Sequence, residues 1–191
     1  FTDNIEGEKI TVFEAADESE EARYVVETAS NLISKGAQPD SIAVLYRANY
    51  QSRILEEAFL MAGLPYQLLG TRFFERKEVK DAISYLKAAI NPGDNENFRR
   101  ALATPSRGIG EVTLQKIIHG EESHLTKGMQ EKVAAFRAIL TDINQAAEEQ
   151  TPSQTIKFIM KRSGLEQEFL KNSEEERIEN LQELVTLAAK Y

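Results

Sequence analysis

The sequence predicts an α/β unit, built on an incomplete three-layer parallel sheet, followed by an all-helical unit that resembles a bundle. Short apolar runs alternate with helical segments in the first part, and only helical periodicity follows Gly70. Arginines gather around residues 97–118 of an otherwise acidic chain, where the architecture changes. We expect the α/β unit to cover residues 1–95 and the helical unit to cover residues 96–191.

Three short apolar segments, each followed by a helical segment, predict the α/β unit. The predicted strands are 9–15, 42–46 and 66–69, and the second is a continuous apolar run typical of a strand buried on both faces. Asp17 and Glu20 have capping-box spacing and begin the first helix, which stops at Gly36. Further helices are predicted at 51–62 and 79–90. Three strands are few for such a sheet, so we expect it to be incomplete.

The part after Asn95 carries helical patterns alone. Apolar stripes predict helices around 98–102, 112–118, 129–143 and 178–188. Another helix is predicted to begin at Thr151-Pro152 and to end at Ser163-Gly164, because proline suits the first turn of a helix and glycine suits its end. These segments predict a helical subdomain without a sheet.

Composition excludes several classes of site. The chain has 191 residues, a net charge of −8, no cysteine and two histidines, so disulfides, thiolate zinc sites and histidine metal clusters are excluded. No apolar run approaches the roughly 20 residues of a membrane span, and the amino-terminal residues lack the layout of a signal peptide. We therefore expect a protein of the reducing cytoplasm with no membrane partner.

The segment R-G-I-G-E-V-T, residues 107–113, is the most specific motif for binding. Gly108 and Gly110 flank Ile109 between two predicted helices, so the turn can present backbone N–H groups at the start of the second helix. Such amides bind phosphate, and Arg107, with Arg99 and Arg100 nearby in sequence, adds cations. The alternative is a helix–helix turn that needs glycine only for its positive φ.

Two predicted strands end in loops that carry cations. Arg72 and Arg76 accompany Phe73 and Phe74 after the third strand, and loops at the carboxyl ends of parallel strands bind ligands. Arginines beside aromatic rings suit single-stranded nucleic acid. The alternative is that the phenylalanines belong to the core and that Arg76 pairs on the surface with a neighbour such as Glu75.

Arg47 and Asn49 follow the second predicted strand, so both could reach a ligand at the same edge of the sheet. Arg47 could equally pair with a helix carboxylate such as Glu56. The sequence contains no G-x-x-x-x-G-K-[ST] loop, no nucleophile beside a base and no metal-spaced carboxylates, so we predict neither catalytic residues nor a metal site in this chain.

Three long segments resemble the UvrD/PcrA/Rep family of superfamily-one DNA helicases. They are I-A-V-L-Y-R-A-N-Y-Q-S-R-I-L-E-E-A (42–58), G-L-P-Y-Q-L-L-G-T-R-F-F-E-R-K-E-V-K-D-A-I-S-Y-L (63–86) and T-P-S-R-G-I-G-E-V-T-L (104–114). The likeness extends to E-R-I-E-N-L-Q-E-L (176–184) and covers essentially the whole chain.

The resemblance implies a fragment of an ATP-dependent motor that moves 3′ to 5′ on single-stranded DNA and unwinds duplex. Residues 1–95 would be the first part of the second RecA-like domain, and 96–191 most of its inserted helical arm. ATP and Mg²⁺ would bind elsewhere in the parent enzyme. We therefore expect neither to bind this fragment, and we expect no ATP hydrolysis or unwinding by it alone. Its partners would be single-stranded DNA, the junction with duplex, and the rest of the motor.

The family's DNA contacts carry over to matching residues of this sequence. Arg76, with Arg72 beside it, matches a single-strand phosphate contact. The turn of Gly108, Ile109 and Gly110, flanked by Arg107 and Thr113, matches the turn by which the arm grips duplex. Ser163-Gly164-Leu165 resembles a second duplex-contacting turn.

Tyr46-Arg47 is not the family's nucleotide-contacting pair, which precedes this start. The alternative function is a non-catalytic α/β-plus-helical module that binds DNA or a protein partner. A small-ligand domain would need a phosphate loop after the first strand, and the sequence has none there.

Overall fold

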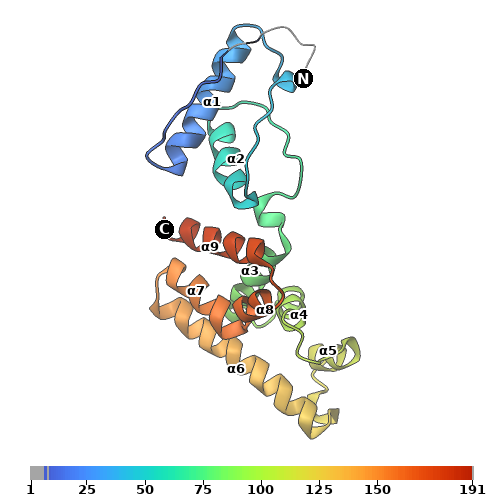
Figure 1. Cartoon of the computed structure of the whole chain (residues 1–191). Coiled ribbons are helices and arrows are strands. Elements are labelled where there is room, and N and C mark those ends of the chain that lie inside the picture. Colours follow the sequence, from blue (N-terminus) through green and yellow to red (C-terminus); the bar gives the residue numbers. More distant parts are fainter. Residues whose placement is uncertain (1–6, 8, 191) are drawn as a thin grey trace. The chain divides into compact units, whose positions relative to one another are not determined.

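The computed structural model describes residues 7 and 9–190 of the chain. Two compact units form: one extends to Arg47 and includes Gln51–Leu69, and the other comprises Ala48–Tyr50 and the chain from Gly70 onward (Figure 1). The division expected at residues 95 and 96 follows the domain order of the resembled family and stays a prediction.

Two helices, α1 (Glu18–Ser34) and α2 (Ser52–Met61), pack together in the first unit. The side chain of Asp17 accepts a hydrogen bond from Glu20 N at 2.8 Å, which confirms the predicted start of α1. Ala22, Val26 and Ala29 form the buried face of α1, at helical spacing. Short 3₁₀ turns occupy Pro39–Ser41 and Asn49–Gln51.

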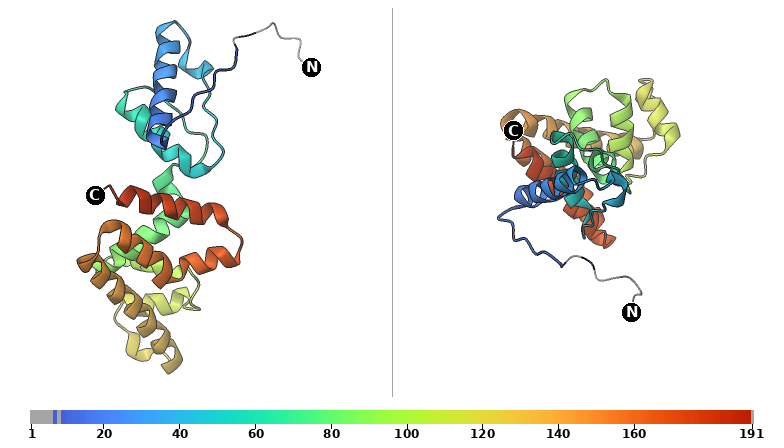
Figure 2. Two further views of the ribbon diagram at one scale, coloured as in Figure 1. Left: turned by 60° about the vertical axis from the view of Figure 1, so that its left-hand side comes forward. Right: turned by 90° about the horizontal axis from the view of Figure 1, so that it is seen from above.

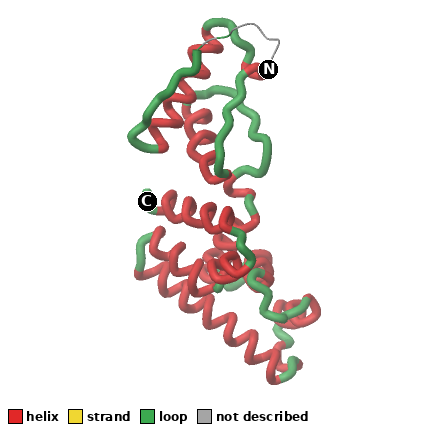
Figure 3. The backbone as a smooth tube through the Cα atoms, in the orientation of Figure 1, coloured by secondary structure: helices red, strands yellow, loops and turns green. Residues whose placement is uncertain are grey.

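The predicted parallel sheet is wrong. The described residues contain no strand, and residues 9–15, 42–46 and 66–69 run as loops (Figure 3). Ile10 and Leu45 are each 94% exposed, and no backbone hydrogen bond joins the three described segments to one another. A strand is held by hydrogen bonds to a neighbouring strand, and β-branched or apolar composition does not supply that neighbour. The described fold is therefore all-α.

The second unit is built of helices joined by loops and turns, and its described part after residue 95 has helices as its regular elements, as predicted. Periodicity did not predict helix α8, which is only seven residues long, and it did not predict the two 3₁₀ turns of this unit. The helices are α3 (Lys77–Ile90), α4 (Asn95–Ala103), α5 (Glu111–Ile118), α6 (Lys127–Glu149), α7 (Pro152–Ser163), α8 (Leu165–Lys171) and α9 (Glu175–Ala188), with 3₁₀ turns at Phe73–Glu75 and Glu122–His124.

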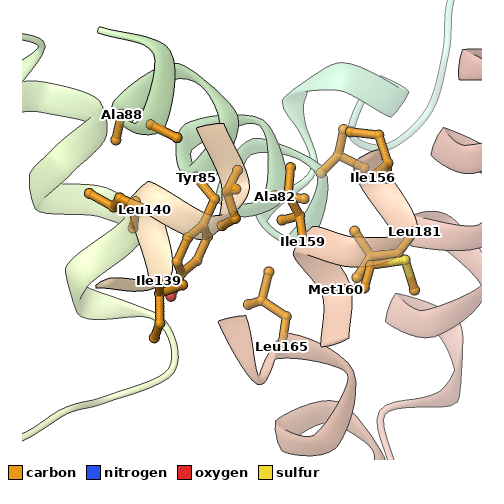
Figure 4. Packing of buried hydrophobic residues seen from close by; sticks show 14 of the residues in the cluster. Ala82, Tyr85, Ala88, Ile139, Leu140, Ile156, Ile159, Met160, Leu165 and Leu181 are labelled. Carbon is orange, nitrogen blue, oxygen red and sulfur yellow. The ribbon is translucent and has the colours of Figure 1, made fainter. Parts of the chain in front are cut away.

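Helix α3 is the centre of this unit, because it packs against α4, α6, α7 and α9 (Figures 1 and 2). Its buried side chains meet those of α6, α7, α8 and α9 in one apolar core (Figure 4). Tyr85 of α3, Phe136 of α6 and Leu165 of α8 are almost completely buried there. The turn before α5 and the turn between α7 and α8 are both flanked by helices that pack in this core.

Candidate nucleic-acid interface

The turn from α4 to α5 contains the two glycines of the motif for which the sequence predicted phosphate binding. Gly108 has a φ of +65°, a conformation that favours glycine, and Gly110 is the N-cap of α5 with φ −83° and ψ 172°. The first α-helical bond runs from Leu114 N to Gly110 O at 3.0 Å, so the N–H groups of Glu111, Val112 and Thr113 have no intrahelical acceptor. Those amides, at the positive end of α5, suit an anion.

Lys132 of α6 adds a cation at this turn. A Cβ on Gly108 would lie 2.9 Å from Lys132 Nζ, so the ammonium group rests against the glycine backbone. Lys132 is exposed and has no ion pair or hydrogen bond within the described residues. Its charge is therefore available to a ligand.

The arginines near the turn are engaged within the protein. Arg99 Nη1 lies 2.5 Å from Glu111 Oε1, and Arg100 Nε lies 2.8 Å from Asp81 Oδ1. The hydrogen bond from Gln115, and next the charge of Arg99, lower the pKa of the Glu111 carboxyl. Burial raises the pKa of Asp81, and Arg100 offsets only part of that effect. The cations that sequence proximity assigned to phosphate therefore serve ion pairs in this structure.

Arg107 points into the unit rather than away from it. Its Nη2 donates to Tyr85 Oη at 2.5 Å and to Ser163 O at 2.8 Å, and its guanidinium carbon lies 5.3 Å from the Phe136 ring centroid. Arg107 thus contacts residues of α3, α6 and α7 at once.

The second predicted turn lies beside the first. Gly164 ends α7 with a φ of +85°, and a Cβ on it would lie 3.7 Å from Cγ of Pro105, which precedes Arg107 by two residues. Ser163, whose carbonyl accepts from Arg107, comes directly before Gly164. The structure therefore places Pro105 and Arg107 of the first turn beside Ser163 and Gly164 of the second, which follow them by more than 50 residues.

The predicted single-strand contacts occupy different environments. Arg76 is only 7% exposed: its Nη1 donates to Asn180 Oδ1 at 2.7 Å and its Nη2 to Asn49 O at 2.6 Å. The Asn180 amide in turn donates to Glu78 Oε1 at 2.6 Å. Arg76 is thus part of a buried hydrogen-bonded network that links its loop to α3 and α9.

The other members of that predicted set are exposed. Arg72 precedes the 3₁₀ turn of Phe73–Glu75, where Phe73 is buried and Phe74 is half exposed. Asn49 donates its side-chain amide to Glu176, while Arg47 lies exposed in the first unit. The structure brings Asn49, Arg72 and Arg76 into the second unit and leaves Arg47 in the first.

Three residues of this interface escaped sequence reasoning. Lys132 lies 24 positions after Gly108, and no local pattern joins them. In the sequence, Tyr85 looks like one more core residue of the helix predicted at 79–90. Asn180 looks like one more polar residue of an acidic helix. The usable signal was that Asn180 lies four residues before the apolar Leu184, a spacing that puts both side chains on one face of a helix.

Comparison with known proteins identifies the family. The model of the UvrD-like helicase C-terminal domain matches residues 1–191. This chain belongs to the UvrD-like helicase C-terminal domain family. The resemblance inferred from the four sequence segments is thereby confirmed.

Named relatives of this UvrD-like domain are DNA helicases. It is 37% identical to DNA helicase II of Salmonella typhimurium and to that of Escherichia coli, with 100% of this chain and 29% of each relative covered. It is 43% identical to the ATP-dependent DNA helicase PcrA of Bacillus subtilis over 61% of this chain and 16% of that protein. The UvrD-like chain thus spans less than a third of the length of these relatives.

Among the described residues of the UvrD-like chain, no helix is long and apolar enough to span a membrane. Within the same residues, no group of three or more histidines and carboxylates is arranged to hold a metal ion.

Proposed function

We propose that this chain is part of an ATP-dependent DNA helicase of the cytoplasm, and that its helical unit grips duplex DNA. The family match and the relatives' names, DNA helicase II and ATP-dependent DNA helicase PcrA, support the motor activity. The rest of the parent motor supplies the ATP and Mg²⁺ site and drives movement 3′ to 5′. By itself the chain is inactive. The alternative of a stand-alone binding module is not favoured, because the matched family is a helicase domain.

The observation that carries the duplex assignment is the turn before α5. The unbonded amides at the positive end of α5 follow Gly110, and the unpaired Lys132 ammonium lies against Gly108, two residues before that glycine. Phosphate oxygens accept hydrogen bonds from such amides, and base edges are not needed for them to do so. The grip is therefore independent of sequence. The second turn at Gly164 lies beside the first and extends the same surface.

The single-strand track uses the loop of residues 71–76. Arg72 and the half-exposed Phe74 supply a cation for a phosphate and a ring for a base. Asn49 and Arg76 are further proposed contacts of the second unit, and Arg47 is a separate proposed contact of the first. The buried Arg76 engages DNA only if a phosphate replaces one of its present acceptors. The natural DNA partner is a junction between single strand and duplex.

Binding by this chain is weak and salt-sensitive, because the net charge is −8 and few cations near the turn are free. The test is fluorescence anisotropy on a plain duplex, a duplex with a 3′ single-stranded tail and a plain single strand, across a salt series. We expect the two duplex-containing ligands to bind more tightly than the single strand, with affinity falling as salt rises. Equal affinity for all three, or no binding to any of them at low salt, would refute duplex gripping by this chain.

A further inference from the structure

We propose that Tyr85 is a positioning residue for duplex binding: through Arg107 it fastens the two glycine turns into one rigid surface. This inference rests on the proposed duplex function. In this proposal Arg107 bonds Tyr85 and Ser163 within the protein instead of contacting a DNA phosphate.

The hydroxyl of Tyr85 is fully committed. Tyr85 is 0% exposed, and its Oη donates to Thr104 O at 2.7 Å while it accepts from Arg107 Nη2 at 2.5 Å. Thr104 begins the first turn, so the hydroxyl ties that turn to the core helix α3. A buried hydroxyl that loses either partner leaves a polar group unsatisfied, which makes the arrangement hard to deform.

Arg107 carries the link from Tyr85 to the second turn. The same Nη2 donates to Ser163 O at 2.8 Å, directly before Gly164. The guanidinium lies near two aromatic rings, with its central carbon 5.3 Å from the Phe136 centroid and 6.0 Å from that of Tyr85. A planar group held between rings and two acceptors has a defined position. Ser163 and Arg107 are 56 residues apart, yet they share one anchor.

The consequence for DNA is that both turns face a duplex at a set spacing before it binds. A surface that is already ordered loses less conformational entropy on binding. Loss of the Tyr85 hydrogen bonds therefore weakens duplex binding, although Tyr85 itself does not contact DNA. Single-strand binding, which depends on the loop of residues 71–76, is unaffected.

The test compares Tyr85→Phe and Arg107→Met, singly and together, in the 191-residue chain. Tyr85→Phe keeps the buried ring and removes one oxygen, and Tyr24→Phe of the first unit is the matched control. Affinities for plain duplex and single strand are measured by anisotropy across a salt series, at a temperature where circular dichroism shows every variant folded. Hydrogen exchange of the turn amides is measured beside them.

We expect Tyr85→Phe to weaken duplex binding about three- to tenfold, the scale of one buried hydrogen bond, with single-strand affinity unchanged. Arg107→Met should act similarly, and the double variant should be no weaker than Arg107→Met because the two residues act as one unit. The slope of log affinity against log salt should stay unchanged, and amides at both turns should exchange faster. Loss of a simple phosphate contact would instead reduce that slope by about one.

Two results separate failure of this inference from failure of the proposed function. If Gly110→Asp abolishes duplex binding while Tyr85→Phe and Arg107→Met do not weaken it, the positioning role is wrong and the duplex function stands. If Gly110→Asp also binds normally, the duplex function is wrong and the inference falls with it.

A second variant keeps the test decisive where Tyr85→Phe fails to fold. Arg107→Lys retains the charge but lacks the planar group beside Phe136, so we expect it to lose duplex affinity. Full affinity in Arg107→Lys, or a shallower salt slope in Arg107→Met, would overturn the positioning role.

Discussion

Gly110→Asp should leave the protein at least as stable while it removes duplex binding. Gly110 is the N-cap of α5, and its φ of −83° and ψ of 172° are the backbone angles that an aspartate N-cap adopts. No atom lies within 4 Å of the Cβ that the substitution would add. The new carboxylate can therefore accept the N–H groups of Val112 and Thr113 without a clash.

The expected changes in stability and in duplex affinity both depend on the N–H groups at the start of α5, which can bond either the new aspartate or a phosphate. Aspartate improves on glycine at an N-cap by a few tenths of a kcal/mol, and the loss of glycine's freedom in the unfolded chain adds about 0.4–1 kcal/mol. The free energy of unfolding should thus rise by about 1 kcal/mol. A phosphate loses charge-assisted hydrogen bonds worth about 1.5–3 kcal/mol, so duplex affinity should fall at least tenfold.

The assay pairs urea unfolding with anisotropy on plain duplex DNA. Gly93→Asp is the matched control, because it adds the same charge in the loop before α4, where a Cβ would meet only Asn91 Oδ1 at 3.5 Å. We expect the control to keep most of its duplex affinity. Unchanged duplex affinity in a folded Gly110→Asp chain would refute phosphate binding at the α5 amides.

Two further predictions concern charges that the tertiary structure places. Lys132→Gln should weaken duplex binding and reduce the slope of log affinity against log salt by about one, whereas the exposed Lys157→Gln should not; equal slopes in both variants would exclude a phosphate contact by Lys132. Burial raises the folded-state pKa of Asp81, so the folded chain holds that proton more readily than the unfolded chain. The contribution of Asp81 to the free energy of unfolding should therefore fall as pH rises from about 4 through the raised pKa. In urea unfolding from pH 4 to 8, the free energy of unfolding of Asp81→Asn should rise relative to that of the unsubstituted chain as pH rises. A difference in free energy of unfolding that stays constant with pH would contradict this.

The helices and their caps could be predicted because their determinants are local. The Asp17 cap of α1, the Thr151 capping box of α7 and the glycine after Ser163 all lie within a few residues of what they stabilise. Periodicity likewise predicted a helix at residues 129–143, within α6. The short helix α8 escaped because seven residues carry too little period to detect.

The chain by itself also determined the family, since four segments matched in order, and it located both glycine turns. It did not determine the strands, because a strand exists only with a neighbour, and the apolar run of residues 42–46 has none within the described chain. Only the tertiary structure decided which cations are free. It buries Arg76 against Asn180, it bonds the half-buried Arg107 to Tyr85, and it sets Lys132 beside Gly108. These pairings join residues far apart in sequence, so they depend on how the helices pack and not on any local pattern.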